Sequence, residues 1–247
     1  YNESVFNGSA LASVTQGVKE NSWAAGVSHY GDGWERNNYG ANAGTGMLSD
    51  SAHCTQAANA GCSGRPQFWR MSHVQGVMGL NLSAKLADIR DGTTNTFMIL
   101  EIRSGITEFD VRGTWAIPGA GPSAVGAHGY FGDARGPNVT QYVNADDIPG
   151  CQAVRDAVGG PEKLQAMGMA CCACADSNPN RQAAARSLHI DGLLAAMCDG
   201  SVQFISDFID LRTTFQYDGD KITNFNPSVW DRLNLSADGY PVGADAF

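Results

Sequence analysis

The sequence of 247 residues contains no apolar run of the roughly 18 residues that a membrane-spanning helix needs. Basic residues are few as well: the 16 Lys and Arg are scattered along the chain, and the formal net charge is −9. Proteins that bind nucleic acid or anionic membranes concentrate basic side chains against the phosphates. We therefore expect no nucleic-acid partner and no membrane contact from this segment.

The chain also lacks the short motifs that mark common catalytic sites. It contains no G-x-S-x-G nucleophile elbow, no H-E-x-x-H zinc helix and no P-loop. His189 and Asp199 suggest acid–base chemistry, because a general base must be oriented by a partner. Asp199 is followed by Gly200, however, and the pair is explained by a turn. We expect a structural His189 and no enzyme; a hydrolase that uses His189 remains an alternative.

Glycine and proline are abundant, with 30 and 9 residues, while only 17% of the chain is charged. This composition is typical of a turn-rich β or α+β protein and not of a helical bundle. The hydrophobic fraction of 43% is enough for a sizeable core, and neither a repeat nor a linker divides the sequence. We expect a single α+β domain over residues 1–247 that is predominantly antiparallel β.

The clearest strand pattern covers residues 96–102. Alternation along a strand places Phe97 and Ile99 on one face and Met98 and Leu100 on the other. Both faces are then apolar, and a strand that is buried on both faces lies inside a sheet and not at its edge. The pattern predicts a central strand.

Four further elements are predicted from local signals. Ser83 is a candidate N-cap for a single helical turn that Asp91-Gly92 would end. Residues 111–116 have the pattern of another strand. Two short helical segments, 152–160 and 161–169, are separated by two glycines and a proline. They form the only helical region that the sequence predicts with a clear pattern.

A β-hairpin is predicted near the C-terminal end. Residues 193–198 and 202–206 form its strands, and Asp199-Gly200 is the two-residue turn, where positive φ angles are required. In this arrangement Val202 and Phe204 would face the core.

The chain has seven cysteines: Cys54, Cys62, Cys151, Cys171, Cys172, Cys174 and Cys198. Cys54 and Cys62 enclose a small polar loop, which favours a local disulfide. Cys151 and the cluster 171–174 favour longer-range pairing. Cys198 lies in an apolar strand pattern and is best explained as a free core thiol. The six remaining cysteines form an even set, which predicts an oxidising compartment, outside the cytoplasm.

Two metal sites were weighed against these interpretations. The alternative to disulfides is a zinc site, with the ligands Cys151, Cys171, Cys174 and His189. Structural zinc usually needs two separated C-x-x-C or C-x-x-H knuckles, which the sequence lacks. The polar tail 218–247 offers calcium candidates at Asp218, Asp220 and Asn224, but their spacing does not match an EF-hand loop. We expect no cofactor; calcium, bound by these three residues, is kept as the alternative.

A polar set accompanies the 96–102 strand. Asp91 and Asn95 are expected to cap backbone amides beside it. Glu101 is expected to pair with Arg103 or Arg112. These pairings would stiffen the fold and would not form a metal site.

Two blocks of sequence resemble a known family. His189, nine residues and then Asp199-Gly200 form an H-x9-D-G pattern, and LADIRDGTTNTFMILE (86–101) supplies Asp91, Gly92, Asn95 and Glu101. Weaker matches follow in NNYGANAGTG (37–46), RGTWA (112–116), GPN (136–138) and the cysteine-bearing stretch before ARS (185–187). In this order, between residues 36 and 210, they resemble the DUF1559 proteins of planctomycetes and related bacteria.

This resemblance implies a pilin-like or pseudopilin-like protein: a prepilin-type leader, a long N-terminal hydrophobic helix and a β-rich globular domain. The sequence resembles the globular domain alone. It implies a structural subunit of an extracellular or cell-surface assembly, such as a filament, tube or sheath, whose partners are copies of itself. Exposed aromatics such as Trp23, Trp34 and Tyr39 are candidate subunit contacts. The alternative is a cell-surface module that binds a glycan or another solute.

Overall fold

The computed structural model describes residues 35–45, 75–79, 82–115, 120–126, 136–172, 182–211, 216–218, 221–223, 226–240 and 242–243. Predictions for several residues lie outside these ranges: Trp23, Trp34, Cys54, Cys62, Cys174, Asp220 and Asn224. Among the described helices, none has the length and apolar character to span a bilayer.

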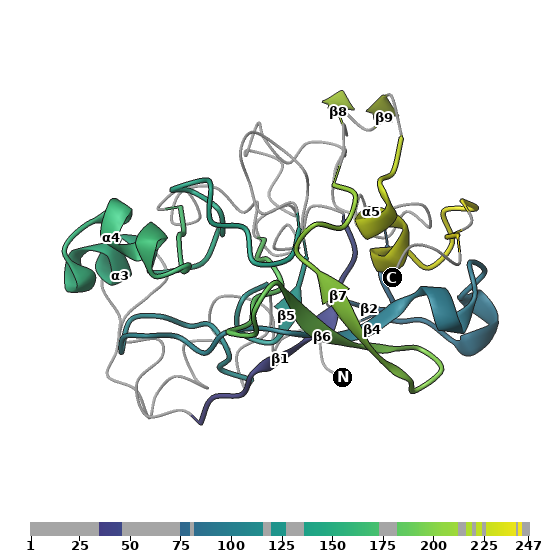
Figure 1. Cartoon of the computed structure of the whole chain (residues 1–247), viewed down its shortest axis with the longest axis horizontal. Helices are drawn as coiled ribbons and strands as arrows, with labels where there is room; N and C mark the ends of the chain where they lie inside the picture. The colour runs from purple at the N-terminus through teal and green to yellow at the C-terminus, as the bar shows by residue number, and fades with distance from the viewer. Residues whose placement is uncertain are drawn as a thin grey trace, which may run out of the picture.

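A five-stranded sheet forms the centre of the fold (Figure 1). Its strands, in spatial order, are β5 (Ala124–Val125), β1 (Tyr39–Asn42), β4 (Phe97–Glu101), β6 (Gly192–Met197) and β7 (Val202–Ser206). The β1–β4, β4–β6 and β6–β7 pairs are antiparallel, and only β1–β5 is parallel. The prediction of an α+β protein with mostly antiparallel strands is confirmed, and so is the central position of β4.

The predicted alternation along β4 is wrong in its first half. The register of β4 against β6 shifts between Phe97 and Ile99, which marks a β-bulge or a similar irregularity. A bulge inserts one residue and so reverses the alternation beyond it. Phe97 and Leu100 are therefore both buried, whereas Met98 and Ile99 are half-buried.

The orientation predicted for β7 is also wrong. The register pairs Leu193 with Ile205 and Leu194 with Phe204, and it is Leu193 and Ile205 that are buried. Successive strand residues point to opposite faces. Val202 and Phe204 consequently lie on the outer face, with 62% and 49% of their surface exposed.

The connection from β6 to β7 contains three residues, and not two, between the hydrogen-bonded pair Met197 and Ser201. The Met197 amide donates to the Ser201 carbonyl (2.8 Å) and the Gly200 amide donates to the Met197 carbonyl (3.0 Å). Of the three connecting residues, Cys198 to Gly200, only Gly200 has a positive φ, of 88°. A three-residue connection that ends in a left-handed glycine is a common way to join antiparallel strands. Asp199 completes the turn by accepting hydrogen bonds from Ser201.

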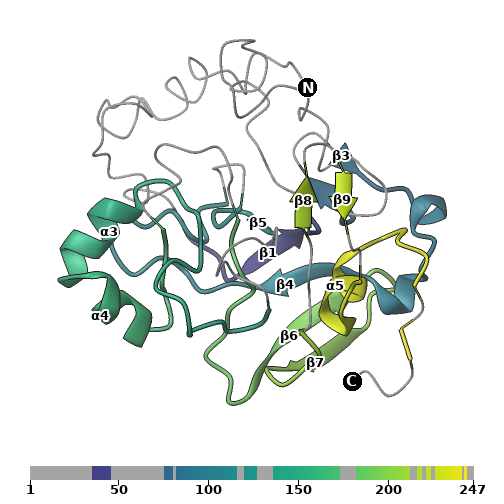
Figure 2. The ribbon, with the colours of Figure 1, turned by 90° about the horizontal axis from the view of Figure 1, so that it is seen from above.

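Two predicted helices are confirmed at one end of the molecule. They are α3 (Cys151–Val158) and α4 (Pro161–Ala166), seen side by side in Figures 1 and 2. Gly159 and Gly160 separate them with φ angles of 90° and 124°, which favour glycine. Pro161 is at the start of α4, where its missing N–H is no loss.

A third helix, α5 (Val229–Asn234), lies in the tail that was predicted to be only polar. It begins with a capping box: Ser228 and Asp231 each use a side chain to bind the other's backbone amide. Trp230 points from α5 to Phe97 of the sheet, with ring centroids 5.3 Å apart. Trp230 and Leu233 share a buried cluster with residues of β4 and β6, so α5 packs against the sheet.

Two local predictions fail for reasons of backbone geometry. The described part of 111–116 is a loop and not a strand, because Gly113 has a φ of 78° and a Cβ there would lie 2.4 Å from the Asn37 carbonyl. Ser83 is not an N-cap, since it belongs to β3. The helical turn starts after Lys85 instead.

The remaining elements are short. A two-stranded sheet pairs β2 (Met78–Gly79) with β3 (Leu82–Ser83), and a second pairs β8 (Gln216–Asp218) with β9 (Lys221–Thr223). Two 3-10 turns precede β4: η4 (Leu86–Asp88) and η5 (Thr93–Asn95).

Candidate functional site

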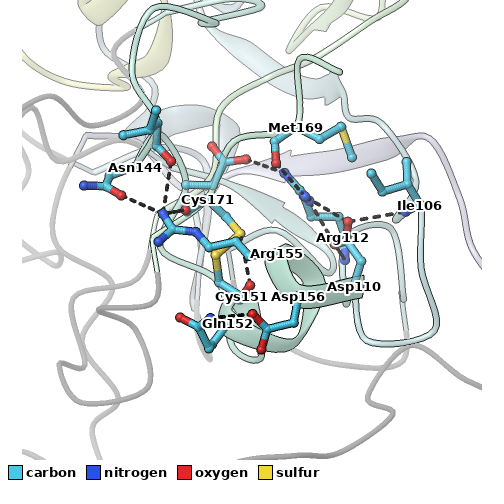
Figure 3. The surroundings of a disulfide bond; sticks show 12 residues. Ile106, Asp110, Arg112, Asn144, Cys151, Gln152, Arg155, Asp156, Met169 and Cys171 are labelled. Atoms are coloured by element: carbon cyan, nitrogen blue, oxygen red, sulfur yellow. Dashed lines mark hydrogen bonds and ion pairs between the residues drawn. A yellow bond between two sulfur atoms is a disulfide. The ribbon is translucent and has the colours of Figure 1, made fainter. Parts of the chain in front are cut away.

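A disulfide joins the start of α3 to the chain that follows α4 (Figure 3). Cys151 and Cys171 are fully buried, with an S–S distance of 2.02 Å and Cα atoms 5.9 Å apart. The predicted longer-range pairing is confirmed for these two residues. A zinc site that uses both is excluded, because their sulfurs are bonded to each other. Cys172 is also disulfide-bonded.

Arg155 of α3 lies beside the disulfide and stabilises this region (Figure 3). Its guanidinium donates to the Asn144 side chain at 2.6 Å and to the carbonyl oxygens of Val143 and Cys171. Burial lowers the pKa of Arg155, against a weaker opposite effect of Glu162. The disulfide and Arg155 together fix the α3–α4 pair to the body of the protein.

Four buried charged side chains form a chain of ion pairs next to the disulfide: Asp110, Arg112, Asp146 and Arg186. Arg112 holds Asp110 with two hydrogen bonds, at 2.9 and 2.8 Å, and reaches Asp146 at 3.0 Å. Arg186 holds Asp146 with two more, at 3.1 and 3.0 Å. None of the four is more than 2% exposed. Two positive and two negative charges leave the network neutral.

The remaining hydrogen-bonding groups of this network are used by the backbone. Arg112 donates to the Met169 carbonyl, and Arg186 donates to the carbonyls of Val139 and Gly168. Burial alone would raise the pKa of Asp110, but the charge and hydrogen bonds of Arg112 hold this pKa below its usual value. Burial likewise opposes the charge of Arg112, while Asp110 and Asp146 raise the pKa of Arg112. Asp110 and Arg112 therefore stay ionised, and the network of four residues has a structural role.

Glu101 and His189 meet beside this network. The Nε2 atom of His189 lies 3.2 Å from Oε1 of Glu101, and Oε2 of Glu101 accepts the backbone N–H of Leu194 at 2.7 Å. The expected pairing of Glu101 with Arg103 or Arg112 is wrong. Arg112 pairs with Asp110 and Asp146. Glu101 instead links β4 to His189, which precedes β6, and to Leu194 of β6.

Asn138 positions the turn that carries His189, a role that the sequence does not predict, since Asn138 stands out only as part of the GPN match. Its side chain accepts the Ser187 amide at 2.7 Å and donates to the Gly192 carbonyl (3.1 Å) and to Asp207 (2.9 Å). Its φ of 49° is a left-handed conformation that asparagine tolerates better than most residues. The Ser187 hydroxyl also stabilises this turn, because it accepts a hydrogen bond from the His189 amide.

A cleft of about 500 Å³ opens at this point. Its walls are residues 38–39 at the start of β1, residues 101–104 and Ile106 at the end of β4, and residues 186–189. The cleft combines a carboxylate–imidazole pair, two arginines, three small polar side chains and several apolar ones.

Arg103 differs from the other charged residues of the cleft in its lack of a carboxylate partner among the described residues. It is half-buried and donates to the Met167 carbonyl, but it forms no ion pair within the described part of the chain. Burial, followed by the positive charges of Arg186 and Arg112, lowers the pKa of Arg103, and Asp110 opposes this effect only weakly. The cleft therefore holds a positive charge that no carboxylate of the described residues pairs with.

The other motif residues lie at the far end of β4. Asp91 accepts the backbone amides of Asp238 (2.7 Å) and Gly239 (3.0 Å), and Asn95 donates to the Asp91 carbonyl at 3.5 Å. Gly92 has a φ of 98° at the start of η5. These residues hold the chain after α5 against the turn before β4.

The two motif blocks contact each other directly. The amides of Cys198 and Asp199 donate to the carbonyls of Thr96 and Thr93, at 2.9 and 3.1 Å. The turn that contains Asp199-Gly200 is thus attached to the turn that precedes β4. Cys198 is a free, half-buried thiol, and burial, followed by the charge of Asp199, raises its pKa to about 11.

No group of three or more His, Cys, Asp or Glu side chains in the described part of the chain is arranged to hold a metal ion. Of the calcium candidates, Asp218 ends β8 and stands opposite Lys221 of β9. Asp220 and Asn224 are outside the described residues, and calcium binding stays a prediction.

Comparison with known proteins gives one match. The model of a family described as "Protein of unknown function (DUF1559)" matches residues 28–212, well over half of the chain. No curated protein and no solved structure matches. The matched region contains both motif blocks, the buried ion pairs and the cleft. The chain belongs to the DUF1559 family.

Proposed function

We propose that this chain is a non-enzymatic structural subunit of an extracellular or cell-surface assembly, such as a pilus-like filament, tube or sheath. Its partners are copies of itself, and its fold is the globular part of a pilin-like protein. The buried disulfide supports an oxidising location. The apolar outer side of the last sheet strand is the observation on which the proposal mainly rests.

Four large apolar side chains form this surface, here called the β7 surface: Ile190, Val202, Phe204 and Phe208. Ile190 and Phe208 are 86% and 83% exposed, more than Val202 and Phe204. Ile190 and Phe208 belong to two turns at one end of β7. A hydrogen bond from the Asp207 amide to the Asp191 carbonyl (2.9 Å) joins these turns. A group of exposed large apolar residues is a common mark of a protein–protein contact.

The edge of the sheet favours a second copy as the partner. β7 is the last strand of the sheet, and its sequence, Val-Gln-Phe-Ile-Ser, contains no charge and no proline. Edge strands of monomeric proteins usually carry such residues to prevent pairing between molecules. An antiparallel partner strand around a two-fold axis can be β7 itself. Such pairing would place the two β7 surfaces next to each other.

Net charge predicts how this association depends on salt. A charge of −9 makes copies repel one another at long range, whereas β7 itself is uncharged. Salt screens the repulsion over about 8–10 Å near physiological ionic strength and leaves apolar contacts in place. Association should therefore increase with ionic strength. A two-fold contact closes a dimer, so a filament also needs a second contact.

The test is light scattering coupled to size-exclusion chromatography, over a range of protein and salt concentrations, with electron microscopy of the same samples. We expect oligomers that grow with both concentrations. Phe204→Lys and Val202→Lys should each shift them toward the monomer. Leu86→Lys adds the same charge at a residue of η4 that is 71% exposed, and should have no such effect. Monomers under every condition would refute the proposal.

A second candidate function, the binding of a solute or glycan at the cell surface, is favoured by the cleft next to Arg103. Its size lies in the range of small-ligand sites, roughly 300–1,000 Å³. A glycan array without any hit would count against this function and would leave self-association unaffected, because the β7 surface does not line the cleft.

A further inference from the structure

The charges that line the cleft can be counted one by one. Arg186 is neutralised by Asp146 at 3.0 Å, and the carboxylate of Glu101 accepts the Leu194 amide and lies 3.2 Å from the Nε2 atom of His189. Arg103 is left as a positive charge without a carboxylate partner in the described part of the chain. An anion in the cleft would supply the partner that Arg103 lacks.

The geometry of a guanidinium selects among anions. Arginine presents a planar fork of N–H donors that matches a carboxylate with two parallel hydrogen bonds. Arg103 uses its Nη1 group on the Met167 carbonyl, and no other hydrogen bond of its guanidinium is formed within the described residues. The rest of the fork is open to a ligand. The repulsion of Arg186 and Arg112 would be relieved by a bound negative charge.

The other walls of the cleft suit a ring with hydroxyl groups. Asn38, Ser104 and Ser187 line the cleft with small polar side chains, and the Ser104 hydroxyl donates a hydrogen bond to the Asn38 side chain at 2.7 Å. These small polar groups can exchange hydrogen bonds with a ligand. The exposed ring of Tyr39 provides an apolar face at the rim. Ile102 and Ile106 add apolar surface.

We propose that this cleft binds an acidic saccharide, with the carboxylate of a uronic acid residue on Arg103 and a sugar ring against Tyr39. The inference rests on the second candidate function and is independent of self-association. The cleft's volume of about 500 Å³ accommodates a short segment of such a chain and not a folded partner.

Isothermal titration calorimetry of the intact protein provides the test. The probes are trisaccharides of galacturonic, glucuronic and mannuronic acid, each compared with its methyl ester, which keeps the rings and removes the charge. We expect at least one acid to bind and its ester to bind at least about tenfold more weakly, as for the loss of a charge-assisted pair. The affinity should also fall with added salt.

Two variants assign the effect to the cleft. Arg103→Gln should weaken binding of the acid at least about tenfold and leave binding of the ester unchanged. Arg90→Gln removes an exposed guanidinium elsewhere and should leave both unchanged. Tyr39→Leu should weaken acid and ester alike. Equal binding of acid and ester, or wild-type affinity in Arg103→Gln, would overturn the inference. Failure of every probe would overturn the inference, whereas the second candidate function would fall only if the glycan array also gave no hit.

Discussion

Asp146 is the residue whose replacement tests the buried ion pairs most directly. Its carboxylate accepts three hydrogen bonds from Arg112 and Arg186 and a fourth from the Ala184 amide, all between 3.0 and 3.1 Å. Asp146→Asn keeps the shape of the side chain. It removes the charge, however, and turns an NH₂ group toward guanidinium N–H donors.

The cost of this change follows from what remains buried. Arg112 keeps Asp110, but Arg186 loses the one carboxylate that it pairs with among the described residues and keeps its hydrogen bonds to carbonyl oxygens. Removing one partner of a buried ion pair typically costs about 3–5 kcal/mol, because the other charge stays buried. For a protein of this size, that loss lowers the melting temperature by roughly 6–20 °C.

Thermal and urea unfolding, followed by circular dichroism with the disulfides intact, measures the effect. The matched control is Asp156→Asn on α3, whose carboxylate is exposed and accepts from Gln152; we expect a change within about 0.5 kcal/mol. A loss of less than about 1 kcal/mol for Asp146→Asn would refute the assignment of a structural role to this network.

The same network predicts how stability depends on acid. The pKa of Asp110 is lowered in the folded protein, because Arg112 outweighs the effect of burial. Stabilisation by this carboxylate is therefore complete above the unfolded-state pKa of about 3.9 and is lost as the pH falls below it toward the folded pKa. Unfolding experiments at pH values between 2 and 6, spaced by roughly half a pH unit, should show that loss of stability. In Asp110→Asn the acid-dependent decrease should be smaller.

Three further predictions concern single features. Burial, and then the neighbouring Asp91, raise the pKa of Asp238 to about 7, so its folded pKa exceeds the unfolded one; Asp238→Asn should raise the melting temperature at pH 8 and leave it unchanged at pH 4. Replacing Cys151 and Cys171 by Ala opens a loop of 20 residues and should cost about 3 kcal/mol in urea unfolding, whereas Cys198→Ala should show no comparable loss. Ser228→Ala removes the N-cap of α5 and should cost about 1 kcal/mol; an unchanged midpoint would contradict the role of the capping box.

The elements that the sequence predicted correctly are those defined by local signals. The central position of β4 follows from an apolar run on both faces, and the division between α3 and α4 follows from Gly159-Gly160-Pro161. The pairing of Cys151 followed from the cysteine cluster behind the helices. The helix α5 was missed although its signal was present: Ser228 and Asp231 have the spacing of a capping box.

The errors arise where tertiary contacts decide. The irregularity after Phe97 reverses the pattern of β4, and nothing in the local sequence marks it. Val202 and Phe204 were assigned to the core because they are apolar, but the pairing of Leu193 with Ile205 sets which face of β7 is covered. Register is fixed by the whole sheet and not by one strand, so a single strand's composition cannot give it.

The ion pairs show how sequence matches carry structural information that their letters do not explain. Arg112 lies in the RGTWA stretch and Arg186 in the ARS stretch, and the one pairing that the sequence predicts for either arginine is that of Arg112 with Glu101. In the structure, these two arginines converge on Asp146 from segments 74 residues apart in sequence, by the difference of their numbers. A residue's partner across such a distance depends on the fold. The sequence offered no basis for choosing Asp110 and Asp146 over Glu101.

The motif blocks hold the sheet and its turns together, and they also border the two proposed contact surfaces, because Glu101 and His189 line the cleft and Ile190 belongs to the β7 surface. Asp91, Asn95 and Asp199 bind backbone groups and join the turn before β4 to its neighbours, and Glu101 joins β4 to β6. These contacts explain why the motifs accompany this fold, and they require no ligand. The side chains of Phe204 and Arg103, which carry the two proposals, take no part in these motif contacts, and Arg103 donates to the Met167 carbonyl instead. Because function is placed on a fold by its surface residues, variants of Phe204 and Arg103 can separate assembly from ligand binding without disturbing the scaffold.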